Sequence, residues 1–313
     1  MQKLIDDLAR CIEKAILGKA EVIYDILKCL IAGGHVLIED VPGVGKTTLV
    51  KALAKTLSLN YNRIQFTPDL LPSDITGVSI YNRNSDRFEF IKGPIFSNII
   101  LADEINRASP KTQSALLEVM EESQVTEGNN TYSMDMPFMV LATQNPVEHE
   151  GTYMLPAAQL DRFMMKVKIG YADEESESRI LQLYGSHDPL EGIWPRAGAE
   201  DIIYLQKSSR EVFASKEITD YIIRIVNATR ENKNTALGAS TRAALSMLKV
   251  AKAAALMEGR DYVVPQDVWD NGVSVLSHRV SLKPSAIVEN LTGETIIQDI
   301  LKRLPVPRVM KHA

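Results

Sequence analysis

The chain has 313 residues, of which 45% are apolar and 24% are charged, a composition typical of folded globular domains and not of disordered or fibrous proteins. Its formal net charge of −5 gives no electrostatic support for nucleic acid as an obligate partner. It has no apolar run near the roughly 18 residues of a membrane-spanning helix and no signal-peptide core, so we expect a cytoplasmic protein that is not integral to a membrane.

The predicted elements begin with two helical patterns before residue 35, separated by residues 16–19. These helices contain Cys11 and Cys29, which we expect to be buried thiols and not part of a disulfide or zinc framework. Strands alternating with helices at 47–57 and 110–122 then predict a three-layer α/β domain around a mainly parallel sheet. The apolar strand candidates are residues 35–39, 63–66, 98–102, 138–143 and 164–169.

The pattern changes to helices alone after residue 172. We find no convincing strand from Asp173 onward, where an N-cap residue is followed by acidic residues of a first helical turn. The predicted helices are residues 173–184, 199–213, 216–233, 241–258 and 265–279. We therefore predict an α/β domain over residues 1–172 and an all-helical domain over residues 173–313.

A glycine-rich loop over residues 40–48 lies between the first predicted strand and a helix. In that setting the backbone N–H groups surround phosphate oxygens, Lys46 reaches the β- and γ-phosphates, and the Thr47 hydroxyl binds Mg²⁺. The first position of the usual P-loop pattern is glycine, and here it is Asp40. The alternative is a turn with a chance lysine. The loop residues predicted to hold ATP are Pro42, Gly43, Val44, Gly45, Lys46, Thr47 and Thr48.

Two further strands each end in polar residues. The strand over 98–102 is followed by Asp103 and Glu104, which predicts an Mg²⁺ ligand and a base that deprotonates the attacking water. The strand over 138–143 leads to Asn145, whose amide we expect to contact that water or the γ-phosphate. Taken alone, either pattern is also explained by an ordinary turn at the end of a strand.

Two arginines are candidates for contact with the γ-phosphate. Arg162 follows a short helical segment and is either an arginine finger for a neighbouring subunit or a surface ion pair with Asp161. Arg242 stands at a helix start, where a cation is unfavourable to the helix dipole, and this indicates an anionic partner. Whether Arg242 acts on its own subunit or a neighbour stays open, as does the role of Arg107.

These segments in this order resemble those of AAA+ ATPases, and specifically of the MoxR family, over nearly the whole chain. Met154, Ala157 and Thr241 depart from the residues usual in that family, without replacing Arg162 or Arg242. The adjacent residues 148–150 cannot easily converge on one metal ion, so we predict no metal site there. The segments that carry the resemblance are residues 39–47, 103–108, 142–146, 150–153 and 160–163.

The resemblance implies a five-stranded sheet with Leu17 and Gly18 near the adenine. It implies an insert over about 75–95 within the second helix, directed toward a central pore and containing the aromatic residues Tyr81, Phe88 and Phe90, and a hairpin over 124–137. Nucleotide-bound subunits of this family form hexameric rings that remodel or activate partner proteins, often ones with a von Willebrand factor A domain.

We therefore predict an Mg²⁺-dependent ATPase with a chaperone-like role, in which Glu104, Asn145, Arg162 and Arg242 act on ATP held by the loop. Three alternatives remain at this point. One is a metal-chelatase motor subunit, which sequence separates poorly from a remodeller. Another is a nucleotide-gated scaffold with little turnover. The third is a nucleic-acid motor, against which the acidic composition argues.

Overall fold

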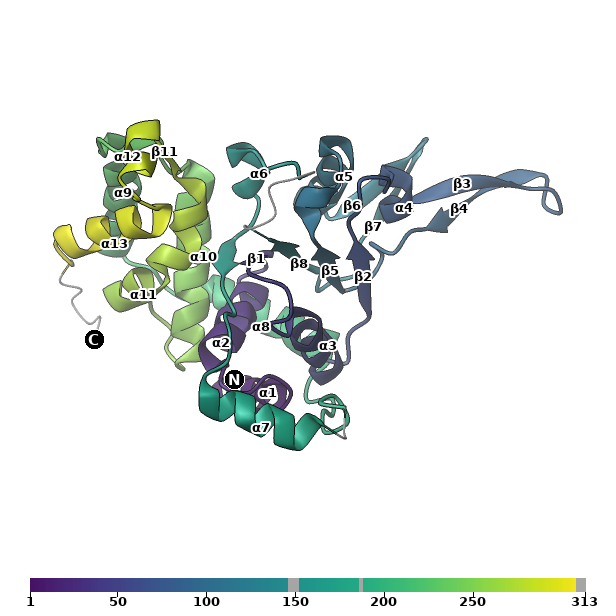
Figure 1. Ribbon diagram of the computed structural model, residues 1–313, viewed down its shortest axis with the longest axis horizontal. Helices are drawn as coiled ribbons and strands as arrows, with labels where there is room; N and C mark the ends of the chain where they lie inside the picture. Colours follow the sequence, from purple (N-terminus) through teal and green to yellow (C-terminus); the bar gives the residue numbers. More distant parts are fainter. Residues whose placement is uncertain (146–151, 186–187, 308–313) are drawn as a thin grey trace.

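The computed structural model describes residues 1–145, 152–185 and 188–307. Its centre is a five-stranded parallel sheet with the strand order β2-β5-β8-β1-β9. This confirms the predicted α/β architecture (Figure 1). The strands of this sheet are β1 (Val36–Glu39), β2 (Tyr61–Gln65), β5 (Ile99–Asp103), β8 (Met139–Gln144) and β9 (Met165–Val167).

The central strands β1, β5 and β8 are buried on both faces, which explains why they are near-continuous apolar runs, whereas the edge strand β2 exposes Asn62 and Arg63. Along β1, Val36 and Ile38 belong to one hydrophobic cluster, whereas Leu37 belongs to the other, as the two-residue period of a strand requires. The first cluster includes α1 (Gln2–Glu13), α2 (Ala20–Ile31) and α3 (Lys46–Thr56). The second includes residues of α4 (Pro72–Thr76) and α5 (Pro110–Glu122).

Two antiparallel hairpins extend this domain. β3 (Gly77–Asn82) pairs with β4 (Arg87–Lys92), and β6 (Gln124–Glu127) pairs with β7 (Asn130–Ser133). The first hairpin projects far from the rest of the molecule (Figure 1). It follows α4 and leads back to β5 without a resumed helix, so the predicted insert stands after a short helix and not within a longer one.

The aromatic residues of the projecting hairpin differ in exposure. Tyr81 and Phe88 are paired across the strands and are 50% and 73% exposed. Phe90, which we predicted to project with them, instead stacks on Tyr132 of β7 with ring centroids 4.4 Å apart. The base of the hairpin is therefore packed against its neighbour, and its outer part is free of such contacts among the described residues.

The C-terminal part is the predicted helical lid, in which the Asp173 carboxylate caps α7 (Glu174–Tyr184) by accepting the Ser176 N–H (2.9 Å). The prediction that it contains no strand is wrong, because β10 (Thr235–Leu237) pairs with β11 (Ser281–Leu282). Such short strands leave no periodic pattern in the sequence. The helices of this part are α7 (Glu174–Tyr184), α8 (Ala199–Glu211), α9 (Lys216–Glu231), α10 (Thr241–Met257), α11 (Pro265–Leu276), η2 (Ser277–Arg279), α12 (Pro284–Val288) and α13 (Gly293–Arg303).

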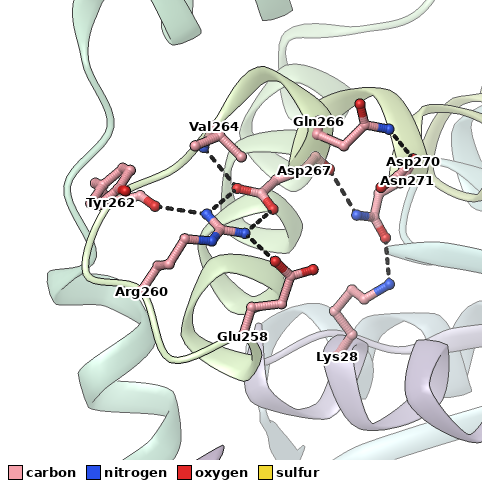
Figure 2. A network of polar contacts seen from close by, with 9 residues as sticks. All are labelled: Lys28, Glu258, Arg260, Tyr262, Val264, Gln266, Asp267, Asp270 and Asn271. Carbon is pink, nitrogen blue, oxygen red and sulfur yellow. Dashed lines mark hydrogen bonds and ion pairs between the residues drawn. The ribbon is translucent and has the colours of Figure 1, made fainter. Parts of the chain in front are cut away.

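A polar network joins this lid to the α/β domain (Figure 2). Arg260 donates to both carboxylate oxygens of Asp267 (2.6 and 2.9 Å), and that carboxylate accepts the Val264 N–H (2.8 Å) at the start of α11. On the next turn of α11, Asn271 accepts a 2.7 Å hydrogen bond from Lys28 of α2. The start of α11 is therefore held locally, and its middle is tied to the α/β domain.

Cys11 and Cys29 are both buried and free, as predicted. Among the helices within the described ranges, none has the length and apolar character needed to cross a bilayer.

Candidate functional site

The glycine-rich loop connects β1 to α3 in the predicted strand–loop–helix order. Gly43 and Gly45 both have φ = +87°, in the left-handed region that favours glycine. Gly45 is the N-cap of α3, and Lys46 begins the helix with its Nζ 2.7 Å from the carbonyl oxygen of Asp40. The loop thus forms the tight turn that a phosphate-binding helix N-terminus requires.

Burial lowers the pKa of Lys46, while the carboxylates of Asp40, Asp103 and Glu104 act in the opposite sense. Three acids therefore surround one amine at the end of the sheet. This arrangement holds a cation in a partly buried position where a polyphosphate could bind it.

Asp40 has a structural role that explains its departure from the glycine pattern. Its carboxylate accepts the N–H groups of Ile169 (2.7 Å) and Gly170 (2.6 Å), while its other oxygen accepts the N–H of Val41 (2.9 Å). Asp40 therefore ties the start of the loop to the segment that connects β9 with α7.

Asp103 lies at the end of β5 with both carboxylate oxygens bonded. Oδ1 accepts a hydrogen bond from the Thr143 hydroxyl (2.6 Å), and Oδ2 accepts hydrogen bonds from Nη2 and Nε of Arg63 (2.6 and 3.1 Å). Arg63 is on the neighbouring strand β2, so a cation that binds Asp103 must compete with this guanidinium or displace it.

Glu104 adopts the left-handed conformation with φ = +57°, unusual for a residue other than glycine. Its N–H donates to the Thr143 hydroxyl (2.8 Å), and its Oε2 accepts from Gln65 Nε2 (2.9 Å) and Arg107 Nη1 (3.0 Å). The carboxylate is therefore held in one orientation by donors from two elements. Arg107, whose role the sequence left open, lies beside Glu104 of its own chain.

Two adjoining cavities lie along the loop. One of about 410 Å³ is lined by Pro42, Gly43, Gly45, Lys46, Thr47, Thr48, Arg63, Asp103, Glu104 and Asn145. The other, of about 430 Å³, shares Gly43, Gly45 and Thr48 with the first and is otherwise mostly apolar. Its remaining lining residues are Ala15, Ile16, Leu17, Lys19, Val44, Gly170, Tyr171, Ala172, Glu177, Ile180, Leu181 and Pro189.

The structure therefore brings most of the predicted site residues together, and it places Leu17 in the apolar cavity. Gly18 does not line it but packs against α7, where a Cβ would lie 2.5 Å from Ser176 Oγ. Residues 146–151, which include the discounted acidic and histidine cluster at 148–150 and part of the motif at 150–153, lie outside the described residues.

The two predicted phosphate-sensing arginines lie together and away from these cavities. Arg162 donates to Glu121 Oε2 (3.1 Å), and Arg242 donates to Oε1 of the same carboxylate. Neither arginine is among the described residues that line either cavity. The helix of Arg242 starts beside Arg162 and not beside the loop, and the contact of Arg242 with a γ-phosphate stays a prediction.

A parallel sheet with a phosphate-binding loop, acids at a strand end and a helical lid defines an ATPase of the AAA class. The comparisons with known proteins agree. Residues 35–165 match the family described as "ATPase family associated with various cellular activities (AAA)", and residues 227–300 match the "AAA lid domain".

Among relatives, the chain is 41% identical to the Chaperone MoxR1 of Mycobacterium tuberculosis, over 95% of this chain and 81% of that one. It is 48% identical to the uncharacterized protein YeaC of Bacillus subtilis, over 98% and 96% of the two chains. A crystal structure from Cytophaga hutchinsonii, described as that of a proposed ATPase, superposes with a TM-score of 0.91 at 43% identity, over 98% and 96%. The chain belongs to the MoxR family of AAA+ ATPases and has a chaperone-like function driven by ATP hydrolysis.

Sequence reasoning missed several residues that contact the predicted ones. Arg63 and Gln65 lie on β2 in register with Leu101 and Asp103 of β5, so both reach the acids at the end of that strand. A signal was available, since residues two apart on a strand share one face. Glu121, by contrast, is an ordinary helical acid in the sequence, and nothing in its neighbours marks it.

Proposed function

We propose that this chain forms a nucleotide-dependent hexameric ring in which each ATP is bound by one subunit and completed by its neighbour. The loop over residues 42–48 holds the triphosphate, and the apolar cavity holds the adenine ring. Arg162 and Arg242 of the adjacent subunit contact the γ-phosphate. The proposed division keeps the α/β domain to residues 1–172 and the lid to residues 173–313.

The residues of the cleft fit a triphosphate and a divalent cation. The left-handed turn leaves the side of Gly43 open, with no atom within 4 Å of a Cβ placed there. Thr47 and Asp103 line the same cavity as Lys46, and hydroxyl and carboxylate oxygens are the ligands that Mg²⁺ prefers. Bound there, Mg²⁺ would neutralise part of the phosphate charge.

The residues of this chain divide the chemistry among them. Lys46 and the loop N–H groups bind the phosphates, and Glu104 accepts a proton as water attacks the γ-phosphorus and the bond to the β-phosphate oxygen breaks. Asn145 orients the water. Gln65 and Arg107, which bond to Glu104 in this structure, keep its carboxylate in position.

One observation carries the proposal of a shared site. The cleft contains the phosphate-binding groups and the general base Glu104, whereas both arginines are paired with Glu121 outside it. Arg162 and Arg242 share one carboxylate and are 30% and 44% exposed, so together they offer a surface that can bind a further anion. The phosphates in the cleft of the same chain are not that anion, because neither arginine lines this cleft. A neighbour's γ-phosphate would replace Glu121 as their partner.

Mixed subunits test this directly. Arg162→Ala and Glu104→Gln should each hydrolyse ATP very slowly alone, because arginine fingers in other ATPases and GTPases contribute roughly 10³–10⁵ in rate. Mixed together, they should recover hydrolysis at interfaces that combine an intact cleft with an intact Arg162. Mixtures of Glu104→Gln with Lys46→Ala form the matched control, because both changes damage the cleft and no complete interface can form. Equal activity in the two mixtures would refute a shared site.

The partner is proposed to be a protein with a von Willebrand factor A domain, remodelled by the ring in the cytoplasm. The support is the family resemblance and the exposed outer part of the β3–β4 hairpin, where Tyr81 and Phe88 lie. Capture on ATP-bound Glu104→Gln, followed by identification of the retained proteins, tests this. A metal-chelatase subunit among them would favour the alternative role as a chelatase motor.

A further inference from the structure

Arg279 of η2 is a buried cation whose contacts surround Arg162. Its side chain is 1% exposed. Its Nη2 donates to the carbonyl oxygen of Phe163 (2.7 Å) and lies 3.2 Å from that of Asp161, the residues on either side of Arg162. His278, next in the chain, donates from Nε2 to the same Phe163 oxygen (2.9 Å). The lid thus holds the backbone of Arg162 from both sides.

The same residues hold the helix that carries Arg242. The Asp161 carboxylate lies 3.3 Å from Arg279 Nε and accepts the Ser240 hydroxyl (2.8 Å). Ser240 is the N-cap of α10, in which Arg242 is the second residue. Arg279 also donates to Ser246 Oγ on α10 (3.1 Å). One buried guanidinium therefore contacts the segment of Arg162, its flanking acid and the helix of Arg242.

Stability alone does not explain this arrangement. Burial lowers the pKa of Arg279 to about 10, with Asp161 acting in the opposite sense, so the group is a charged cation at neutral pH. Its Nη1 and Nε have no hydrogen-bond partner among the described residues, and its hydrogen bonds all leave Nη2. Burying a charge is costly, and a well-packed apolar side chain is often as stable or more so. What the guanidinium supplies is a rigid plane that places Nη2 among three acceptors while Nε lies beside the Asp161 carboxylate.

We propose that Arg279 is a positioning residue for the arginine pair: it joins the segment of Arg162 and the helix of Arg242 into one unit with a fixed orientation toward the neighbouring ATP. This inference rests on the proposed shared site. It assigns Arg279 to the half of the interface that meets the neighbour's nucleotide, and not to the cleft of its own chain.

The test compares the buried Arg279 with the partly buried Arg260, another lid arginine. Arg279→Met keeps an unbranched, buried side chain and removes the guanidinium with its bonds to both segments. Arg260→Met is the matched control, because Arg260 also holds a buried carboxylate, yet its bonds stay within residues 258–267 (Figure 2). A displacement near 1 Å of a catalytic group can cost about 100-fold in rate. We expect kcat to fall about 10- to 100-fold in Arg279→Met and less than about threefold in Arg260→Met.

Two further measurements separate positioning from loss of folding. Arg279→Met should bind ATP with a Kd within about twofold of the parent by calorimetry, since Arg279 does not line the described cleft. Mixing it with Glu104→Gln should restore part of its hydrolysis, because the neighbour then supplies correctly placed arginines. Arg279→Lys, which retains the charge without the rigid guanidinium plane that places Nη2, is the second variant, and it should fold like the parent and give an intermediate kcat.

The outcomes are distinct. Suppose that Glu104→Gln subunits restore hydrolysis to Arg162→Ala but not to Arg279→Met, or that Arg279→Lys has the kcat of the parent. Either result would overturn this inference and leave the shared site standing. Failure to rescue Arg162→Ala would overturn the shared site, and the inference with it.

Discussion

Asp40 offers the sharpest perturbation of the cleft, because its carboxylate joins two walls of it. Replacement by glycine, the residue usual at this position of a P-loop, removes the bonds to Ile169 N–H (2.7 Å) and Gly170 N–H (2.6 Å). It also removes the bond from the Val41 N–H within the loop (2.9 Å). Gly170 lines the apolar cavity together with Val44. The substitution should therefore loosen the contact between the phosphate-binding loop and the wall of the cavity that we expect to hold the adenine ring.

The magnitude follows from the number and kind of bonds lost. Hydrogen bonds to a charged group contribute about 1.5–3 kcal/mol each, and partial rehydration of the freed N–H groups returns some of this. For the two distant donors we expect Asp40→Gly to lower the free energy of unfolding by about 2–4 kcal/mol. In Asp40→Asn the amide oxygen can still accept both distant N–H groups, which bond to one oxygen, but it is uncharged, and the NH₂ group faces the Val41 N–H, so the loss should be about half as large.

Two assays follow from this argument. Urea denaturation measures the loss of folding stability, and calorimetry measures the affinity for ATP. We expect this affinity to fall at least about tenfold in Asp40→Asn, which corresponds to a loss of about 1.4 kcal/mol of binding free energy. Asp201→Asn is the matched control, since Asp201 accepts the Gly198 N–H (2.8 Å) at the start of α8. A parent-like affinity in Asp40→Asn, or an equal loss in Asp201→Asn, would show that the tether does not shape the cleft.

Other changes test the acids and the buried histidine. Glu104→Gln should bind ATP like the parent and lose about 10²–10⁴ in kcat, the range for a general base; unchanged phosphate release would remove Glu104 from that role. Arg63→Gln should lower the Mg²⁺ concentration needed for nucleotide binding by up to about fivefold, because a half-exposed ion pair with Asp103 is worth at most about 1 kcal/mol; an increase in that concentration would contradict competition between Arg63 and the metal. His35 accepts the Val140 N–H at Nδ1 (3.0 Å) and so donates from Nε2 to the Met120 carbonyl (2.9 Å) as a neutral ring, and burial lowers its pKa from 6.5 to about 4. The unfolded chain therefore binds the extra proton first as pH falls below 6.5, and between pH 6.5 and 5 the parent should lose about 2 kcal/mol more stability than His35→Gln, measured by urea midpoints; parallel pH profiles would count against the buried neutral ring.

The features predictable from sequence were those with a local signal. All five strands of the parallel sheet were predicted, and the signal is strongest in the central strands β1, β5 and β8, because burial on both faces produces short apolar runs. The residues at their carboxyl ends, such as Asp103 and Asn145, then converge at one edge by the geometry of a parallel sheet. The location of most of the candidate site followed from these two facts.

The remaining features depend on contacts between distant parts of the chain. Glu121 meets Arg242 across 121 residues, and Arg279 meets Phe163 across 116. The pairing of β10 with β11 is similarly long-range and too short to leave a pattern. Asp40 is instructive in another way, because a departure from a motif looked neutral until its carboxylate was found to bond to a distant segment.

A crystal structure of the assembled protein with Mg²⁺ and a non-hydrolysable ATP analogue tests the shared site most directly. The account predicts the triphosphate within the loop at residues 42–48 and the adenine ring in the cavity beside Leu17. It predicts Arg162 and Arg242 from the adjacent subunit at the γ-phosphate, both released from Glu121. A fully occupied cleft at a formed subunit interface, with both arginines still bound to Glu121, would contradict it.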